Sequence, residues 1–464
     1  MTPEPSNHDT IAAIATPMGQ AGIGIIRLSG PQAAEIAKKI FLPKRPVKDY
    51  QNRQLYLGHL IDPPSGCMID QVLVSFMKAP HSYTREDVVE INSHSGYLIL
   101  SKILQTVLAE GARLAKPGEF TFRAFIHGRI DLTQAEAVID LINARSERGL
   151  QLASRQIDGH LKTEIDLLRK KGIEILAHLE VAIDFPEEEQ EILSKKDLIE
   201  QIEKELLSHT EKILAAHSQR KIWMDGINTV IVGRVNAGKS SLLNRLLNEE
   251  RAIVTPIPGT TRDIIESTIY IDGIPLRLID TAGFRSVKGE VEKIGIRLTE
   301  QKMARADLSL IVVDQSRPLN QYDLNLIRRS EKNRSLIVLN KIDLPSALDK
   351  ERHNKIFNGF QVIRISALTG EGIYNLRTAI VRMILSGCAD TVPSDLIPNL
   401  RHKAALAEAF QCYQNAVRNL KEDLPTEIIA VDLKGGLDAL GEIIGETTSE
   451  EILDKIFSQF CLGK

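Results

Sequence analysis

The chain has 464 residues, of which 43% are hydrophobic and 26% are charged, and its net charge is −3. This length exceeds what one compact core usually holds and predicts about three domains of roughly 150 residues each. The slightly negative charge excludes a general cationic attraction to nucleic acid, so that any RNA contact would need a local basic patch or a partner.

The cysteines and the first residues both indicate a reducing compartment. Cys67, Cys388, Cys412 and Cys461 lie far apart and form no C-x-x-C pair, which argues against a zinc site or a disulfide framework. The opening MTPEPSNHDT lacks the basic and apolar regions of a signal peptide, and no apolar run approaches the roughly 20 residues that span a bilayer. We therefore expect a cytoplasmic protein.

The first half of the chain predicts an α+β domain followed by helices. Short apolar runs with turn signals, such as IGIIRLSG and QVLVSF, extend to residue 128 and indicate strands interleaved with helices. Over 129–221 apolar residues recur every three or four positions, which is typical of amphipathic helices. Pro186 interrupts this pattern, and Ser194 with Asp197 predicts the start of the next helix.

The second half predicts an α/β domain and a return to helices. Over 222–385, continuous apolar runs such as NTVIVG and LSLIVVD alternate with helical patterns, as in a parallel sheet covered on both faces. TVPSDLIPNL is typical of a linker, and the rest of 386–464 is mostly helical, with Thr448 and Glu451 predicting a capping box. The fold class is thus multidomain α/β and all-α, with an N-terminal α+β domain and a nucleotide domain inserted into a discontinuous helical domain.

Residues Gly233 to Ser240, GRVNAGKS, match the phosphate-loop pattern G-x-x-x-x-G-K-[ST] between a predicted strand and a predicted helix. The glycines let backbone N–H groups surround phosphates at a helix N-terminus. Lys239 supplies a positive charge, and the Ser240 hydroxyl can bind Mg²⁺.

Three later motifs make the predicted nucleotide GTP. Asp280 in LIDTAG ends a strand, where it can hold Mg²⁺ through water, and the Gly283 N–H can reach the γ-phosphate. Asp343 of NKID can accept hydrogen bonds from guanine N1–H and its 2-amino group, which adenine does not offer. The backbone of the segment that begins at Ser366 can reach guanine O6.

The motifs identify the residues that bind GTP more clearly than the residue that activates water for its hydrolysis. Phe284 stands where many GTPases carry the glutamine that orients the attacking water. From the chemistry alone, either Glu290 or Glu292 can take that role, or both can be surface charges. The side-chain oxygen of Asn236 can hold a monovalent cation beside the β- and γ-phosphates.

Several segments together resemble the MnmE (TrmE) family of tRNA-modification GTPases over nearly the whole chain. They are GTTRD at 259–263, FCLGK at the C-terminus, IDLTQAEAV at 130–138 and ATPMGQAGIGIIRLSG near the start. The resemblance implies a potassium-activated GTPase that works as a homodimer. It places the catalytic glutamate at Glu292, magnesium ligands at Ser240 and Thr261, and potassium ligands at Asn236, Thr255, Ile257 and Thr260.

The motifs and the resemblance together predict a set of GTP-binding residues in five segments. These are Asn236, Ala237, Gly238, Lys239, Ser240 and Ser241; Thr255, Pro256, Ile257, Pro258, Gly259, Thr260 and Thr261; Asp280, Thr281, Ala282 and Gly283; Asn340, Lys341 and Asp343; and Ser366, Ala367 and Leu368.

The resemblance also implies a tetrahydrofolate derivative, 5,10-methylene- or 5-formyl-tetrahydrofolate, bound by the N-terminal domain. Its contacts fall on Arg27, Glu90, Arg129 and Lys464, and a carboxylate such as Glu90 suits a pterin ring. Cys461 would lie near the one-carbon donor and act there as acid, base or nucleophile, unless it only packs at a helix end. Arg85 and Ser95 stand where family members commonly carry glycine.

The implied function is modification of wobble uridine, U34, at C5 in certain tRNAs. An FAD-dependent partner of the MnmG (GidA) family would join it, with glycine or ammonium as the amine source, and tRNA would be held largely through the complex. The alternative is a ribosome-assembly or signalling GTPase whose flanking domains bind only RNA or protein. FCLGK and the N-terminal segment favour the tRNA-modification reading.

Overall fold

The computed structural model describes residues 9–17, 19, 21–144, 146–184, 194–249, 268–279, 301, 303–348, 355–386 and 395–464. These residues form two compact units. The first contains Met1–Ile142, Gln156–Leu207 and Ala405–Lys464, and the second contains Asn143–Arg155 and Ser208–Ala404. Both units are built from segments that are distant in sequence. No helix among the described residues is long and apolar enough to cross a membrane.

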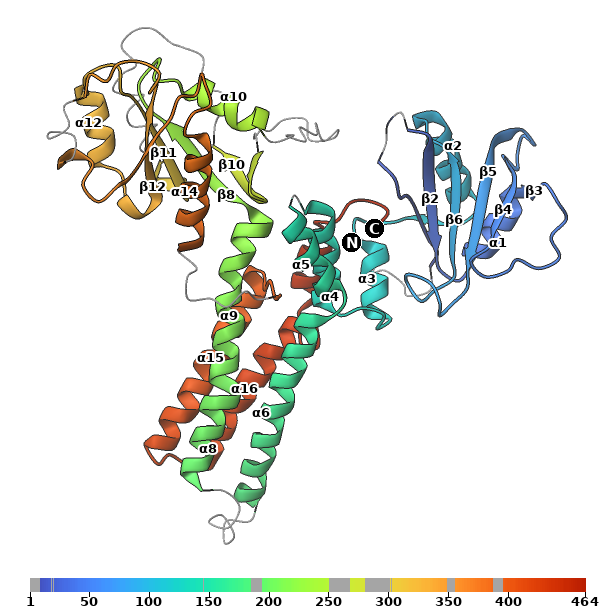
Figure 1. The fold of residues 1–464 in the computed structure, drawn as a ribbon. Coiled ribbons are helices and arrows are strands. Elements are labelled where there is room, and N and C mark those ends of the chain that lie inside the picture. The colour runs from blue at the N-terminus through green and yellow to red at the C-terminus, as the bar shows by residue number, and fades with distance from the viewer. Residues whose placement is uncertain are drawn as a thin grey trace. The chain divides into compact units, whose positions relative to one another are not determined.

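A seven-stranded sheet begins the first unit, with the order β3-β4-β5-β6-β2-β1-β7 (Figure 1). Its neighbouring strands are antiparallel, except for the parallel pair of β1 and β7. The strands are β1 (Ile11–Ile14), β2 (Ile23–Ser29), β3 (Phe41–Pro43), β4 (Leu55–Ile61), β5 (Met68–Met77), β6 (Val88–His94) and β7 (Arg113–Leu114).

Two helices, α1 (Ala33–Ile40) and α2 (Tyr97–Ala109), share one apolar core with this sheet. Alternate residues of β5, such as Val72 and Val74, point into that core, because successive side chains of a strand face opposite sides. The other face of the sheet therefore carries the intervening residues, including Leu73, which is 40% exposed.

The helices of the first unit continue from the middle of the chain to its end. Leu161, Ile165 and Leu168 are buried on one side of the long helix α6, as their spacing predicts, and α6 packs along α16 (Figure 1). The helices are α3 (Glu119–Ile126), α4 (Leu132–Asn143), α5 (Glu147–Ile157), α6 (His160–Asp184), α8 (Lys195–Gln201) with a π-helical turn at Ile202–Leu207, α15 (Leu400–Lys421), α16 (Thr426–Ile444) and α17 (Glu450–Phe457). Helices α5 and α15 extend into the second unit.

Of the two predicted helix starts, one is confirmed and one is wrong. Ser194 is the N-cap of α8, and its side chain accepts a hydrogen bond from the Asp197 N–H. Helix α17 has Ser449 rather than Thr448 as its N-cap, without a side-chain capping bond. The Thr448 hydroxyl instead donates to the carbonyl of Glu442 at 3.0 Å, so a bond to the last turn of the preceding helix α16 takes the place of the predicted cap.

The second unit contains a six-stranded sheet with the order β13-β12-β11-β8-β10-β9. The strands from β13 to β10 run parallel and only β9 is antiparallel. Every residue of β11 and β12 is buried, as expected for central strands covered on both faces. The strands are β8 (Ile227–Val232), β9 (Thr268–Ile271), β10 (Ile274–Leu278), β11 (Leu308–Asp314), β12 (Ser335–Asn340) and β13 (Gln361–Arg364).

Two apolar clusters lie on the two faces of this sheet. One includes residues of α10 (Lys239–Glu249) and α14 (Ile373–Ser386), and the other includes residues of α12 (Gln321–Arg328). Helix α9 (Ser208–Arg220) and a π-helical turn at Lys221–Asp225 lead into β8, and a 3₁₀ turn at Lys332–Arg334 precedes β12. Mixed α/β and all-helical parts in one chain confirm the fold class expected from the sequence.

Candidate nucleotide and tail sites

Three of the predicted nucleotide motifs meet at the carboxyl edge of the second sheet. The phosphate loop follows β8, the NKID segment begins at the end of β12, and Ser366 lies two residues after β13. Because these strands are parallel, their carboxyl ends share one edge. Open parallel sheets bind ligands at this edge, where the chain changes direction along the strand order.

The phosphate loop closes around the Lys239 side chain, whose ammonium donates to the carbonyls of Gly233 and Arg234 at 2.8 Å each. Burial lowers the pKa of Lys239. Gly238 has φ +95°, and a Cβ there would meet the side-chain nitrogen of Asn340, so the loop needs glycine at this position. Lys239 also begins α10, where free N–H groups and the helix dipole favour an anion.

Asn340 joins the phosphate loop to the segment after β13. Its side-chain N–H donates to the Ala237 carbonyl at 2.9 Å, and its Oδ1 accepts from the Ala367 N–H at 3.0 Å. The Ser366 hydroxyl donates to Asp343 Oδ1 at 2.6 Å, while the Asp343 side chain remains exposed to solvent. A fixed, solvent-facing carboxylate beside a backbone loop is what recognition of guanine requires.

Lys341 pairs with Asp314, the last residue of β11, at 2.7 Å. Burial raises the pKa of the Asp314 carboxyl, but hydrogen bonds from Lys341 and Ser316 outweigh that effect and leave its pKa below the ordinary value. Lys341, two residues before Asp343, is thereby held in its ion pair with Asp314. Its backbone has φ +67°.

A second set of predicted residues meets on the first sheet. Arg27 on β2 lies directly opposite Glu90 on β6, and both Nε and Nη2 of Arg27 contact Glu90 Oε1 at 2.8 Å. Arg27 Nη1 also donates to the carbonyl of Gly463 at 3.2 Å, although 436 positions separate the two residues. Lys464, the fourth predicted folate contact, is the next residue after Gly463.

Arg129 joins this group through Tyr83. The Tyr83 ring centre lies 5.2 Å from the Arg129 guanidinium carbon and 5.9 Å from that of Arg27. Arg129 also donates to the Ser82 carbonyl, and the Tyr83 hydroxyl lies 3.0 Å from that of Thr121. The structure therefore brings Arg27, Glu90 and Arg129 together and places the Gly463 carbonyl, directly before Lys464, beside them.

The C-terminal tail is docked in a defined conformation. Phe457 and Phe460 are buried with Leu132 and Ala135. Gly463 is buried with φ +89°, and a Cβ there would lie 2.7 Å from the Ala15 Cα, so no other residue fits without movement. Cys461 is a free thiol exposed to solvent.

Comparisons with known proteins give the same assignment. The profile described as the MnmE helical domain matches residues 132–461, and the profile described as the GTP-binding protein TrmE N-terminus matches residues 10–129. The tRNA modification GTPase MnmE of Alkaliphilus oremlandii is 45% identical over 98% of this chain and 99% of its own length. That of Bacillus subtilis is 44% identical over 98% of this chain and all of its own. The chain belongs to the MnmE family of tRNA-modification GTPases.

Among solved structures, the G domain of the T. maritima FeoB iron transporter is 28% identical over 34% of this chain and 98% of its own. Its TM-score of 0.25 is too low to support an inference about the fold.

Part of the predicted MnmE machinery lies outside the described residues. These residues are Thr255, Pro256, Ile257, Pro258, Gly259, Thr260, Thr261, Asp280, Thr281, Ala282, Gly283 and Glu292. The described metal-ligand candidates are Ser240, in the first turn of α10, and Asn236, whose φ of +65° is tolerated by asparagine. A hydroxyl suits Mg²⁺ and an amide oxygen suits K⁺, so both side chains fit the expected ions. The described residues contain no group of three or more His, Cys, Asp or Glu side chains arranged to hold a metal.

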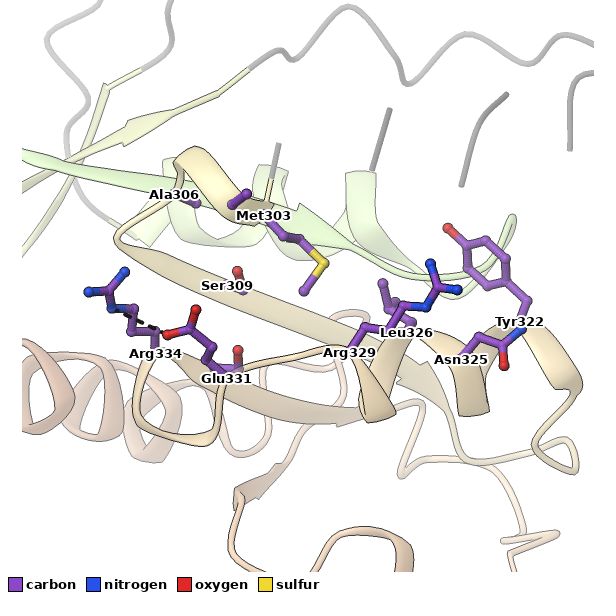
Figure 2. A pocket seen from close by; sticks show the side chains of 11 residues that line it. Met303, Ala306, Ser309, Tyr322, Asn325, Leu326, Arg329, Glu331 and Arg334 are labelled. Carbon is purple, nitrogen blue, oxygen red and sulfur yellow. Dashed lines mark ion pairs between the residues drawn. The ribbon is translucent and has the colours of Figure 1, made fainter. Parts of the chain in front are cut away.

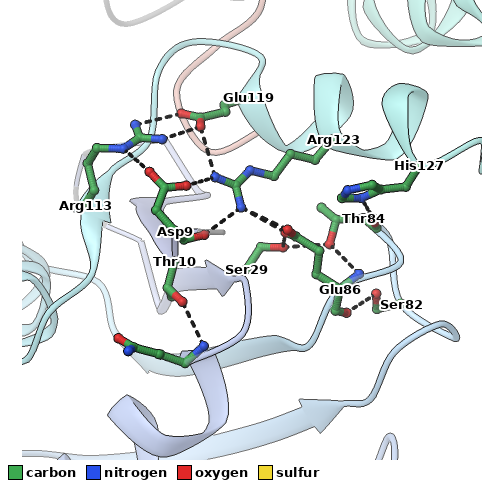
Figure 3. Close-up of polar contacts among 11 residues, drawn as sticks. Asp9, Thr10, Ser29, Ser82, Thr84, Glu86, Arg113, Glu119, Arg123 and His127 are labelled. Carbon is green, nitrogen blue, oxygen red and sulfur yellow. Dashed lines mark hydrogen bonds and ion pairs between the residues drawn. The ribbon is translucent and has the colours of Figure 1, made fainter. Parts of the chain in front are cut away.

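We call the group of Arg27, Glu90, Arg129 and Gly463 the tail site. The sequence patterns did not predict a buried charge network next to it; Figure 3 shows this network. Arg123, with 5% of its side chain exposed, contacts Asp9 at 2.5 Å, Glu86 at 3.0 Å and Glu119 at 3.3 Å. Arg113 contacts Asp9 and Glu119 at 2.6 Å each. Only the Glu119–Arg123 pair, four residues apart on α3, is a local pattern. The other members, Asp9, Glu86 and Arg113, come from three further segments, so local spacing does not reveal the network.

The network fixes the segment that carries Tyr83. Ser29 bonds both Thr84 and Glu86, the Ser82 hydroxyl donates to the Glu86 carbonyl at 2.5 Å, and His127 Nδ1 lies 2.7 Å from the Thr84 carbonyl. Arg85 within it has φ +60°, a backbone conformation that favours glycine.

A pocket of about 250 Å³ in the second unit lies away from the nucleotide motifs (Figure 2). It is lined by Ser309 and Ser335, at the amino ends of β11 and β12, and by Leu326 and Arg329 at the end of α12. The phosphate and guanine motifs are at the opposite, carboxyl ends of the same strands. This pocket is therefore not part of the nucleotide site.

Proposed function

We propose that this MnmE-family chain is a potassium-dependent GTP hydrolase that acts in the modification of wobble uridine 34 of certain tRNAs. With an FAD-dependent MnmG-type partner it adds an aminomethyl or carboxymethylaminomethyl group at C5. The observation that carries the proposal is the tail contact between Arg27 and Gly463, beside Glu90. A GTPase that only switches between states has no need for a C-terminus docked at such a polar site.

In the GTPase step, the phosphate loop and Lys239 hold the phosphates, and Asp343 selects guanine. Ser240 and Thr261 would hold Mg²⁺, and Asn236, Thr255, Ile257 and Thr260 would hold K⁺; the two cations would stabilise negative charge on the phosphates. Glu292 orients the attacking water. The remaining predicted GTP-binding residues complete this site. The phosphate loop, closed around the Lys239 side chain, supports this assignment.

At the tail site, Arg27, Glu90, Arg129 and Lys464 hold a tetrahydrofolate derivative, which supplies the one-carbon unit. The cations suit the carboxylates of a folate, and Glu90 suits a ring N–H and amino group. Cys461 lies three residues before the terminal Lys464 and acts there as acid, base or nucleophile. The mutual proximity of Arg27, Glu90 and Arg129, and the position of Gly463 directly before Lys464, support this assignment.

We further propose that the chain is a cytoplasmic homodimer that binds tRNA largely in complex with its partner. The face of the first sheet opposite α1 and α2 supports self-association, because it exposes Leu55, Leu57, Leu73 and Ile23 by 57%, 43%, 40% and 64%. The domains would be 1–128 for folate binding and dimerisation, 129–221 and 386–464 for the helical domain, and 222–385 for the GTPase.

Nucleoside mass spectrometry of tRNA from cells that lack this protein tests the proposal. The cells are rescued with wild type or with Cys461→Ser, and GTP hydrolysis by both proteins is measured in K⁺ and in Na⁺. We expect wild type alone to restore C5-modified wobble uridine, with equal GTPase rates that fall in Na⁺. Failure of wild type to restore the nucleoside would favour a ribosome-assembly role, and rescue by both proteins would reduce Cys461 to packing.

A further inference from the structure

Arg245, on helix α10, contacts the segment that follows β13. Its Nε donates to the Ala367 carbonyl at 3.3 Å, and its Nη2 donates to the Leu368 carbonyl. Arg245 lies six residues after the phosphate-loop lysine, so the helix that begins at the phosphate site also reaches the predicted guanine loop. Arg245 is not part of any of the GTP-binding motifs.

The N–H groups of the same segment are divided between the protein and solvent. The Ala367 N–H donates to Asn340 at 3.0 Å, and the Thr369 N–H donates to the Ser366 hydroxyl at 3.1 Å. The Leu368 N–H has no hydrogen-bond acceptor among the described residues, and Leu368 as a whole is 77% exposed. This N–H is therefore available to a ligand at the site.

The two Arg245 contacts act on that available N–H through the peptide bond. The Ala367 carbonyl and the Leu368 N–H belong to one peptide group. A cation that bonds the carbonyl oxygen draws electron density from the nitrogen, and hydrogen bonds in such a chain strengthen one another. Arg245 also fixes the orientation of this peptide group, because its planar guanidinium holds two successive carbonyls.

We propose that Arg245 is a positioning residue that sets selectivity for the 6-oxo group of the purine. The inference rests on the proposed GTP binding and adds a residue to it. Asp343 recognises N1–H and the 2-amino group, whereas the Leu368 N–H, oriented and polarised by Arg245, recognises O6. The N1–H and 2-amino donors and the O6 acceptor are thus recognised by separate parts of the site.

Nucleotide analogues separate this role from a general effect on the fold. Sulfur at position 6 of 6-thio-GTP is a weaker acceptor than O6, whereas inosine triphosphate keeps O6 and lacks only the 2-amino group. Isothermal titration calorimetry on the full-length protein measures the Kd of GTP and of both analogues for wild type, Arg245→Ala and Arg245→Lys. Arg382→Ala removes an exposed arginine from helix α14 of the same unit and is the matched control.

We expect Arg245→Ala to weaken GTP binding about tenfold, the order of magnitude of one hydrogen bond, because the Leu368 N–H loses its orientation and polarisation. It should weaken 6-thio-GTP binding much less, so that the preference for GTP over the thio analogue falls, while the preference over inosine triphosphate stays constant. Arg245→Lys should fall between wild type and alanine, and Arg382→Ala should match wild type.

Three results overturn the inference. They are unchanged affinities in Arg245→Ala, equal weakening of GTP and 6-thio-GTP, and a changed ratio between GTP and inosine triphosphate. If Arg245→Ala does not fold, the same ratios in Arg245→Lys decide. Failure of the wild type itself to bind GTP would instead overturn the proposed function.

Discussion

Single residues of the nucleotide site act through fixed partners. Asn340 bonds two separate loops, and Ser366 holds the Asp343 carboxylate by one hydrogen bond. The bond from Ser366 restrains the Asp343 carboxylate before a base binds. Binding the base then costs less rotamer freedom than it would with a flexible carboxylate. Selectivity for guanine should therefore depend strongly on the Asp343 side chain.

Asp343→Asn should weaken GTP binding by at least about 100-fold, because an amide N–H₂ would face the donor groups of guanine. The same variant should bind xanthosine triphosphate better than wild type does, because xanthine carries an acceptor oxygen in place of the 2-amino group. Calorimetric titration with both nucleotides checks the exchange. Loss of both affinities would show that the substitution damages the loop rather than its selectivity.

Gly463→Ala should release the tail from the first sheet, because the added Cβ would lie 2.7 Å from the Ala15 Cα. We expect at least a tenfold loss of C5-modified uridine, measured by mass spectrometry, with an unchanged GTPase rate. Leu462→Ala is the control, since that side chain is 55% exposed and should tolerate truncation. Equal modification by all three proteins would contradict the proposed role of the tail.

At the scale of elements, the charge network holds the 82–86 segment and helix α3 together around Arg123 (Figure 3). Burial raises the pKa of both Asp9 and Glu119, but hydrogen bonds from the arginines outweigh it and leave both pKa values below ordinary. A buried pair contributes little net stability, yet removing one partner leaves an uncompensated charge.

Arg123→Met should lower the free energy of unfolding of the first unit by roughly 3–5 kcal/mol, because Asp9, Glu86 and Glu119 lose their shared cation. Scanning calorimetry would record this as a lower Tm for the transition of that unit. Arg85→Gly, which removes an exposed arginine at φ +60°, should leave the Tm unchanged or slightly higher. Similar Tm values for both variants would contradict the importance of the network.

The same network should appear in the pH dependence of stability. Carboxyls with a lowered folded-state pKa stabilise the fold above their ordinary values of 3.8 and 4.5, and this contribution is lost as the pH falls through the folded-state values. The Tm of the first unit should thus fall below about pH 4.5 in wild type. The fall should be shallower in Arg123→Met, whose remaining carboxyls have pKa values closer to ordinary.

At the scale of the whole molecule, the nucleotide motifs and the tail site belong to different compact units. The tail site itself joins the two ends of the chain, because Arg27 on β2 holds the carbonyl of Gly463. The sheet that carries Arg27 also exposes apolar side chains on the same face, since β4, β5, β6 and β2 align Leu57, Leu73, Asn92 and Ile25 in one row.

Leu57→Glu should convert the proposed dimer to a monomer, because a charge would be buried opposite Leu73 in the interface. Size-exclusion chromatography with light scattering at low micromolar concentration measures the mass directly. Leu98→Glu is the control, because Leu98 is 80% exposed on α2, which packs on the other face of the sheet. A dimer that persists in Leu57→Glu would place the interface elsewhere.

The sequence by itself determined the nucleotide motifs, because a phosphate loop works through its own backbone and local glycines. The order of strands and helices was equally predictable, since β11 and β12 are continuous apolar runs that only a covered parallel sheet accommodates. The four folate positions came from resemblance alone, because Arg27 and Glu90 look like ordinary charges at the level of sequence. Tertiary structure decided what surrounds them. The contacts of Arg27 with Gly463, of Arg123 with Asp9, and of Arg245 with Ala367 join residues more than 100 positions apart. Only the packing of whole elements brings such partners together, and no local spacing encodes it.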